Sequence, residues 1–257
     1  MDSFCADDFW DDNFTLSESI PHLTTCFEHT VLVYLPAAFL VLFLPIFLVQ
    51  ARRISRRFDS LPVTALFVVR LILTIYLFLN ATAVFVLNTF ILDGKFTVDI
   101  VYPCVLMVFF LLHLFIDYIR LRCGQNSSGI QHLSLVLLSI CGVPEFGYHI
   151  ENTTFNESMP IFILYMAFWP IVVLQTFLYC FTDKRKPDAD KSEELDSGFL
   201  NRLTNWWFTT VQIRGAKNDL EMDDLFDLNP GSKSPHLGAL FEKYWIPKLK
   251  GIANERS

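Results

Sequence analysis

Polar side chains that can do chemistry stand inside two long apolar stretches of the sequence. Arg70 lies well inside the first, and His113 and Asp117 stand at i and i+4 in the next, a spacing that shares one helix face. An arginine at the centre of a membrane-spanning helix costs about 2.5–3.5 kcal/mol on insertion scales, so Arg70 should face protein or reach toward an interface. Two hypotheses follow, a path for a proton or charged substrate and an interhelical contact. We favour the contact.

Motifs for nucleotide, metal or hydrolytic chemistry are absent from the sequence. The nearest approach to a phosphate-binding loop is Gly231-Ser232-Lys233-Ser234, which lacks the glycine that the motif places before its lysine. No H-E-x-x-H, G-x-S-x-G or dinucleotide-binding pattern occurs, and no cysteines have C-x-x-C spacing. The net charge of −7, without a basic stripe, argues against nucleic acid as a partner. We expect no catalytic residue, cofactor or metal site in this chain.

The elements that carry these polar residues are predicted to be membrane-spanning helices. A helix needs about 20 mostly apolar residues to cross about 30 Å of hydrocarbon. Hydrophobic residues make up 53% of the 257 residues, and they concentrate between two polar ends. Five segments qualify, the fourth less clearly: residues 31–50, 62–87, 98–119, 130–148 and 159–181. The sequence therefore predicts an all-α membrane protein, a five-transmembrane-helix bundle whose surface contacts the lipid bilayer.

Basic residues indicate how this bundle is oriented. They follow the first, third and fifth apolar segments, at Arg52–Arg57, at Arg120 and Arg122, and at Lys184–Lys186. Cytoplasmic loops carry an excess of Lys and Arg. We therefore place residues 1–30 outside the cytosol and residues 182–257 inside it. The sequence predicts an integral protein of the plasma membrane or another endomembrane.

N-glycosylation sequons give an independent indication of the same orientation. Three of them, at Asn13, Asn152 and Asn156, lie on the side that we place outside. Two others, at Asn80 and Asn126, fall within a span and on the cytosolic side. We expect glycans only at the first three.

Cys5 and Cys26 are the only cysteines on the outer side, where conditions favour oxidation. We predict that they form a disulfide, with two free thiols as the alternative. On the chain-entropy model, closing a loop of about 20 residues stabilises a fold by roughly 3 kcal/mol.

Residues 182–257 differ in character from the apolar region. A charged stretch reads as a solvated linker, and residues 199–211 then place apolar side chains at i, i+3 and i+4 spacing. This pattern predicts an amphipathic helix too polar to span a membrane, lying on the inner leaflet through Phe199, Leu203, Trp206 and Trp207. Packing of this helix against a soluble domain is the alternative. Two further short amphipathic pieces follow.

The order of these segments resembles the multidrug-resistance-associated proteins, subfamily C of the ABC transporters. The resemblance covers about residues 1–245 and rests on short motifs in a specific order: Cys26-Phe27-x-x-Thr30-Val31-Leu32-Val33, Cys180-Phe181-x-Asp183, Phe199-Leu200-x-Arg202-Leu203-Thr204-x-Trp206-Trp207 and Arg214-Gly215. It implies a five-helix N-terminal membrane domain and a lasso-like cytosolic linker with an interfacial helix. In the family these precede a transporter core that uses ATP and Mg to export organic anions, conjugates and xenobiotics.

The resemblance implies an accessory domain rather than a complete exporter. The family's ATP-binding residues have no counterpart in these 257 residues, and we recognise none for Ile246–Ser257. We therefore expect a chain truncated before the core, with a transporter core or another membrane protein as partner. The alternative is a stand-alone small transporter or receptor that uses Arg70, His113 and Asp117.

Overall fold

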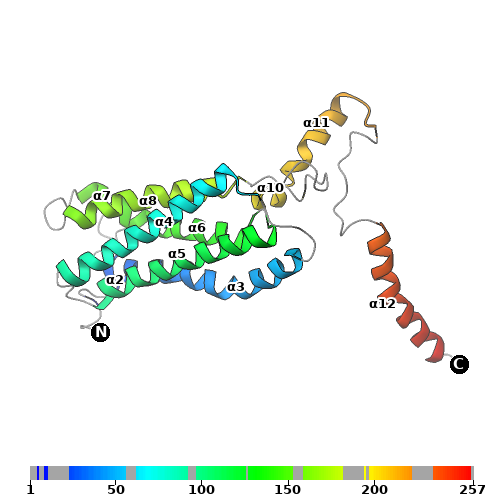
Figure 1. Ribbon diagram of the computed structural model, residues 1–257, viewed down its shortest axis with the longest axis horizontal. Helices are drawn as coiled ribbons and strands as arrows, with labels where there is room; N and C mark the ends of the chain where they lie inside the picture. The colour runs from blue at the N-terminus through cyan, green and yellow to red at the C-terminus, as the bar shows by residue number, and fades with distance from the viewer. Residues whose placement is uncertain are drawn as a thin grey trace. The chain divides into compact units, whose positions relative to one another are not determined.

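The computed structural model describes residues 5, 9–10, 23–55, 62–91, 97–125, 127–152, 159–181, 194, 197–221 and 234–255. Every regular element within these residues is helical. The chain divides into two compact units, Met1–Lys184 and Arg185–Ser257 (Figure 1). The first unit carries the long apolar helices, and the second carries the helices of the tail.

The first unit is a bundle in which five helices pack in a closed ring. Following the contacts around the ring, α3 packs on α5, α5 on α4, α4 on α8, α8 on α6, and α6 on α3 (Figure 1). The elements are α2 (Thr25–Phe27), η1 (Glu28–Leu32), α3 (Val33–Ser55), α4 (Ala65–Val86), η2 (Leu87–Ile91), α5 (Thr97–Cys123), α6 (Gly129–Cys141), α7 (Val143–Asn152) and α8 (Met159–Leu178).

Four of these helical stretches are long and apolar enough to cross a membrane: Thr25–Ser55, Ala65–Phe90, Thr97–Cys123 and Gly129–Gly147. They coincide with the first four predicted spans. By the same measure the fifth predicted span, residues 159–181, contains a shorter apolar helix, Phe162–Leu178. Two of these helices begin at capping residues. The hydroxyl oxygen of Thr64 accepts a hydrogen bond from the backbone N–H of Phe67 at the start of α4, and that of Ser128 accepts one from Gln131 at the start of α6.

The surface of the bundle is apolar, as well as its core. The core gathers residues such as Leu40, Phe109 and Leu135, each at most 1% exposed. Facing outward, Leu42 is 70% exposed and Phe177 is 59% exposed. Soluble proteins rarely expose contiguous apolar surface on this scale, so the helices require an apolar surrounding such as lipid.

The fourth predicted span, residues 130–148, is divided in the structure into α6 and α7. The division falls at Gly142, where an added Cβ would overlap the side chain of Trp169. Trp169 lies this close because its Nε1 donates a hydrogen bond to the Ser139 carbonyl oxygen at 3.1 Å. A glycine thus permits α8 to approach α6 at the point where the helix turns.

The second unit corrects the prediction of a single helix over residues 199–211. The segment consists of α10 (Phe199–Leu203), the 3₁₀ turn η3 (Trp206–Phe208) and α11 (Thr209–Lys217). Asn205 interrupts the helix because its φ of 54° is left-handed, a conformation that asparagine tolerates better than most residues. The later part of the tail, from which we expected short pieces, contains the 22-residue helix α12 (Ser234–Glu255).

Candidate functional site

The residue at the centre of the buried polar cluster is Asp117 of α5. Its carboxylate accepts hydrogen bonds from Arg120 Nη1 at 2.9 Å, from Gln131 Nε2 of α6 at 3.1 Å, and from the Tyr179 hydroxyl at 3.0 and 3.1 Å. All four side chains are at most 4% exposed. The charge of Asp117 is therefore compensated by a buried arginine and two further donors.

Arg70 of α4 joins this cluster through Tyr179, which directly follows α8. Its guanidinium carbon lies 4.9 Å from the centre of the Tyr179 ring, and its Nη2 donates to the carbonyl oxygen of Phe181 at 2.6 Å. A cation over an aromatic face is attracted by the ring quadrupole. The Tyr179 side chain thus contacts Arg70 with its ring and Asp117 with its hydroxyl.

A second contact ties α8 to α4 one turn away. Gln175 Nε2 donates to the backbone oxygen of Arg70 at 3.1 Å and to Thr74 Oγ1 at 2.9 Å. Thr74 and Gln175 are 2% and 1% exposed. The amide therefore binds the α4 backbone at the very residue that carries the buried guanidinium.

His113 lies in the same cluster and faces α6. Its Nε2 is 3.1 Å from Ser134 Oγ, and its backbone oxygen accepts a hydrogen bond from Gln131 Nε2 at 3.2 Å. Gln131 thereby bridges the two members of the predicted i, i+4 pair, since the same nitrogen reaches Asp117. The cluster consists of Arg70, Thr74, His113, Asp117, Arg120, Gln131, Ser134, Gln175 and Tyr179.

Sequence reasoning thus singled out three members of this cluster and missed the others. Arg120 was assigned only to the basic residues at the cytosolic end, although its i, i+3 spacing from Asp117 was a readable signal. Gln131, Gln175 and Tyr179 are polar groups within or beside apolar segments. Buried polar groups require partners, so their presence was a second signal.

The arrangement is suited to holding helices together. With two guanidinium groups and one carboxylate, the formal charge of Arg70, Arg120 and Asp117 is +2 − 1 = +1. At 2% exposure or less, these groups are shielded from solvent. In the part of the chain that the structure describes, no group of three or more His, Cys, Asp or Glu side chains is placed to hold a metal ion.

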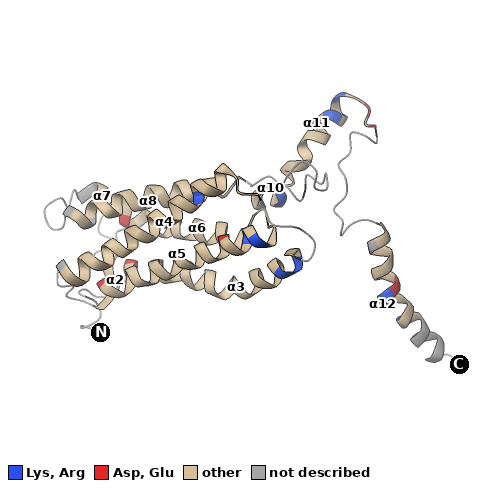
Figure 2. Cartoon of the chain, viewed as in Figure 1, with Lys and Arg blue, Asp and Glu red and all other residues tan. Residues whose placement is uncertain are grey.

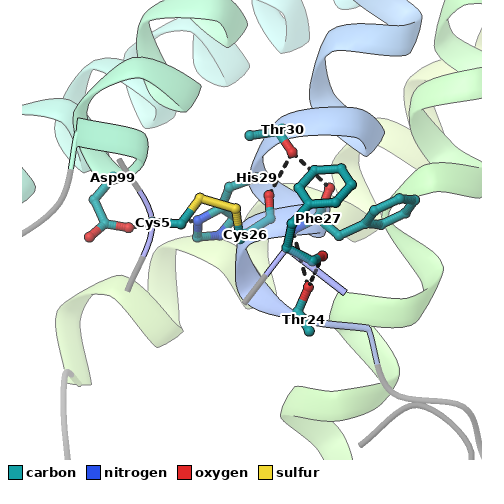
Figure 3. The surroundings of a disulfide bond; sticks show 8 residues. Cys5, Thr24, Cys26, Phe27, His29, Thr30 and Asp99 are labelled. Atoms are coloured by element: carbon teal, nitrogen blue, oxygen red, sulfur yellow. Dashed lines mark hydrogen bonds and ion pairs between the residues drawn. A yellow bond between two sulfur atoms is a disulfide. The ribbon is translucent and has the colours of Figure 1, made fainter. Parts of the chain in front are cut away.

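The predicted disulfide between Cys5 and Cys26 is confirmed, with Cα atoms 5.6 Å apart (Figure 3). It packs against Val98 at the start of α5. Beside it, Thr24 Oγ1 donates to the Phe9 carbonyl oxygen at 2.7 Å, and the rings of Phe9 and Trp10 meet Phe27 edge-on. The described part of the N-terminal segment is thus fastened to the first helix.

The remaining predicted sites are the glycosylation sequons and the apolar residues of the tail. Asn13 and Asn156 are outside the described residues, and Asn152 is the last residue of α7. In the tail, Leu203 and Trp206 are 68% and 69% exposed, whereas Phe199 and Trp207 are partly buried. Their side chains therefore leave apolar surface open on the second unit.

Comparison with known proteins shows relatives but no matching family model. The chain is 37% identical to the multidrug resistance protein mrp-7 of Caenorhabditis elegans over 96% of its length. It is 27% identical to human ATP-binding cassette sub-family C member 3 over 100% of its length, and 25% identical to human member 2 over 97%. Because one match covers the whole chain, it includes Ile246–Ser257, for which we had recognised no counterpart.

The chain spans about a sixth of the length of these relatives, 17%, 18% and 16% respectively. The matched part is N-terminal in each of them.

Proposed function

We propose that this chain, an integral membrane protein homologous to the N-terminal part of the multidrug-resistance-associated subfamily C of ABC transporters, acts as an accessory membrane domain of an ABC exporter. The observation that carries this proposal is the match to mrp-7, which covers 96% of this chain but only 17% of the length of mrp-7. On this proposal, ATP binding and the export of organic anions, conjugates and xenobiotics reside in the part of the exporter outside the match.

The geometry of the bundle supports an anchoring role. The polar groups of the Asp117 cluster interact with one another, from α4 through Tyr179 to α5 and α6. Such a network fixes the packing of the helices and leaves their apolar outer faces for lipid or for another membrane helix.

The orientation that we propose has the N-terminus outside the cytosol and five spans, with α8 as the fifth. The last turns of α3 and α5 carry Arg52, Arg53, Arg120 and Arg122, and the basic residues that the structure describes in the first unit lie toward one end of the bundle (Figure 2). The positive-inside rule favours that end as the cytosolic one.

The second unit is the proposed coupling segment to the transporter core. Trp206 in η3 and Phe241 and Trp245 in α12 are 69%, 61% and 48% exposed. Aromatic residues are enriched where proteins meet partners and where helices lie at membrane interfaces.

A stand-alone transporter or receptor that uses Arg70, His113 and Asp117 is the less supported function. A path for a substrate or proton needs polar groups that solvent can reach, whereas these three side chains are at most 2% exposed.

Co-expression with a separate core tests the proposal. The partner polypeptide would be the part of the nematode relative mrp-7 that follows the matched region. We expect the two polypeptides to copurify, and we expect delivery of the core to its membrane to depend on the chain. The matched control is a chain that ends at Lys184, which keeps the bundle and lacks the second unit. If the control copurifies with the core as well as the full chain does, the tail does not couple the bundle to the core. If the full chain does not copurify with the core, the accessory function is refuted.

A further inference from the structure

A second group of charged side chains lies apart from the Asp117 cluster and surrounds a cavity. The cavity has a volume of about 190 Å³ and is bounded by residues of η1 and of the helices α2 to α8. Its polar lining includes Glu28, His29, Glu145 and His149, and its aromatic lining includes Tyr102 and Tyr165. These residues come from the helix ends that we place on the outer side.

The cavity is amphiphilic. Its apolar wall is formed by side chains that include Leu106, Leu138 and Phe168, which belong to the core of the bundle. A ligand that fits it therefore has an apolar part and a charged end. A volume of about 190 Å³ admits only a compact ligand.

The polar end of the cavity is lined by two carboxyl groups, Glu28 and Glu145, and a third, Asp99, lies beside it next to His29. Glu28 and Glu145 contribute at most −2 to this lining and His29 and His149 at most +2, so its formal charge depends on which of these groups hold protons. His29 lies between two of the carboxylates, with Nδ1 3.8 Å from Asp99 and Nε2 3.5 Å from Glu145 (Figure 3 shows the Asp99 side). Its ring also stacks on Tyr102, with centroids 4.1 Å apart.

Glu28 is the residue whose position the fold does not explain. It is 7% exposed, lines the cavity, and makes no hydrogen bond or ion pair within the described part of the chain. A buried carboxylate is costly, and it takes up a proton unless a sufficient counter-charge lies nearby. A cation in the cavity would supply that counter-charge.

The backbone that presents Glu28 and His29 is itself unusual. Both residues belong to the π-helical segment η1, which interrupts the α-helical stretch between α2 and α3. π-helical turns are rare and often occur at functional sites, where they redirect side chains. The Cys5–Cys26 disulfide immediately precedes this segment and fastens it to the N-terminal tail.

We propose that this cavity binds a compact amphiphilic organic cation, with its ammonium group between Glu28 and Glu145 and its apolar part against Leu106, Leu138 and Phe168. The rings of Tyr102 and Tyr165 face the same space and contribute cation–π attraction. The cation is either a free amine or the ammonium headgroup of a lipid, since both offer the same chemistry.

Isothermal titration of the full chain in dodecyl maltoside micelles tests the proposal, because this detergent has no ammonium group. The probe is 2-phenylethylamine, and the matched probes are neutral 2-phenylethanol and anionic phenylacetate. We expect saturable binding of the amine at one site, binding of the alcohol at least tenfold weaker, and no binding of the anion. Equal affinity for amine and alcohol, or no saturable binding of the amine, would overturn the proposal.

Two variants then assign the site. Glu28→Gln and Glu145→Gln should each weaken amine binding by about tenfold or more, because charge-assisted hydrogen bonds are the strong class. The control is Glu242→Gln, an exposed carboxylate of α12, which should leave the affinity unchanged. Unchanged affinity in both cavity variants would refute the site. Loss of the Cys5–Cys26 disulfide would show that a variant fails to fold. In that case the comparison of amine and alcohol on the unaltered chain still decides whether the chain binds a cation.

The source of the cation is distinguished by adding phosphatidylethanolamine to the micelles. If phosphatidylethanolamine competes with 2-phenylethylamine, the site is assigned to a lipid headgroup. If it does not compete, the site is assigned to a free amine.

Discussion

At the scale of single residues, Asp117 determines how the helices meet. Its carboxylate is held by Arg120, Gln131 and Tyr179, and Tyr179 carries the contact on to Arg70. Removing one partner of a buried ion pair is more damaging than never having had the pair, because the other charge is left uncompensated. The cluster therefore makes the packing of α4, α5, α6 and α8 specific.

Replacement of Arg120 by alanine should destabilise the bundle strongly. We expect a loss of about 3–5 kcal/mol in the free energy of unfolding, since Asp117 would keep its charge without its arginine. Arg122→Ala is the matched control, because Arg122 is exposed two residues further along the same helix. That control should change stability by no more than about 0.5 kcal/mol. Denaturant titration in micelles measures both, and equal losses would contradict the role of the ion pair.

The disulfide gives a second prediction at this scale. Thiol tagging of the unfolded, unreduced chain should label the four cysteines that are free in the structure, Cys104, Cys123, Cys141 and Cys180. Reduction should add labels at Cys5 and Cys26. Cys5→Ser should expose Cys26 to the tag without reduction and destabilise the fold by roughly 3 kcal/mol on the chain-entropy model. Full labelling before reduction would show that the bond does not form.

At the scale of the elements, the breaks in the helices matter as much as the helices. Gly142 separates α6 from α7 and lies against Trp169, so α8 approaches closely at this point. Gly142 also lines the cavity that contains Glu28 and Glu145, which we call the outer cavity.

A pair of glycine substitutions tests this reading of the break. Gly142→Ala should destabilise the bundle by about 1–3 kcal/mol, because the added Cβ overlaps Trp169 and the packing must shift. Gly147→Ala is the control, since a Cβ at Gly147 meets nothing within 4 Å and alanine favours the helix by about 0.5–1 kcal/mol. Thermal unfolding in micelles compares the two. A similar effect of both substitutions would show that the contact with Trp169 is unimportant.

The tail elements carry the prediction of membrane binding. Trp206→Ser combined with Trp207→Ser should release a separately expressed tail, residues 182–257, from liposomes in a flotation assay. Large aromatic side chains bury about 150–250 Å² each, so two indoles supply much of the apolar area that docks a short helix. Gln212→Ser, an exposed polar position of α11, is the control and should leave flotation unchanged. If the double variant floats as well as the parent, Trp206 and Trp207 do not bind the tail to the membrane, and α12 remains the element that could do so.

At the scale of the whole molecule, charge is unevenly distributed along the bundle. Arg52, Arg53, Arg120 and Arg122 belong to the last turns of α3 and α5, whereas Glu28, Asp99 and Glu145 lie in the first turns of η1, α5 and α7. Figure 2 shows the described basic residues of the first unit toward one end of the bundle. This distribution supports the proposed orientation and places the two acidic residues of the outer cavity, Glu28 and Glu145, at the opposite end from the arginines.

Glycosylation tests the orientation directly. Asn13, Asn152 and Asn156 should carry glycans that an endoglycosidase removes, with a mobility shift lost step by step on Asn→Gln substitution. Asn126 should carry none, and neither should Asn80, whose side chain is 5% exposed and donates to the Leu164 carbonyl oxygen. A glycan at Asn126, or none at any of the three outer sites, would contradict the topology.

The sequence by itself determined the class of the protein and the extent of its apolar helices. Long runs of apolar residues follow local rules of length and composition, so the four longest apolar helices, the disulfide and the three cluster members Arg70, His113 and Asp117 could be predicted without coordinates. The short motifs in their order also sufficed for the family resemblance, which the relatives confirm.

Only the tertiary structure decided which residues meet across the bundle. Gln131, Gln175 and Tyr179 join the cluster because of the ring order of the helices, and helix order depends on side-chain packing between segments far apart in sequence. The same holds for the breaks at Gly142 and Asn205 and for the cavity, where Glu28 and Glu145 come together from helices more than a hundred residues apart. Periodicity describes one helix at a time, so it contains no information on these contacts.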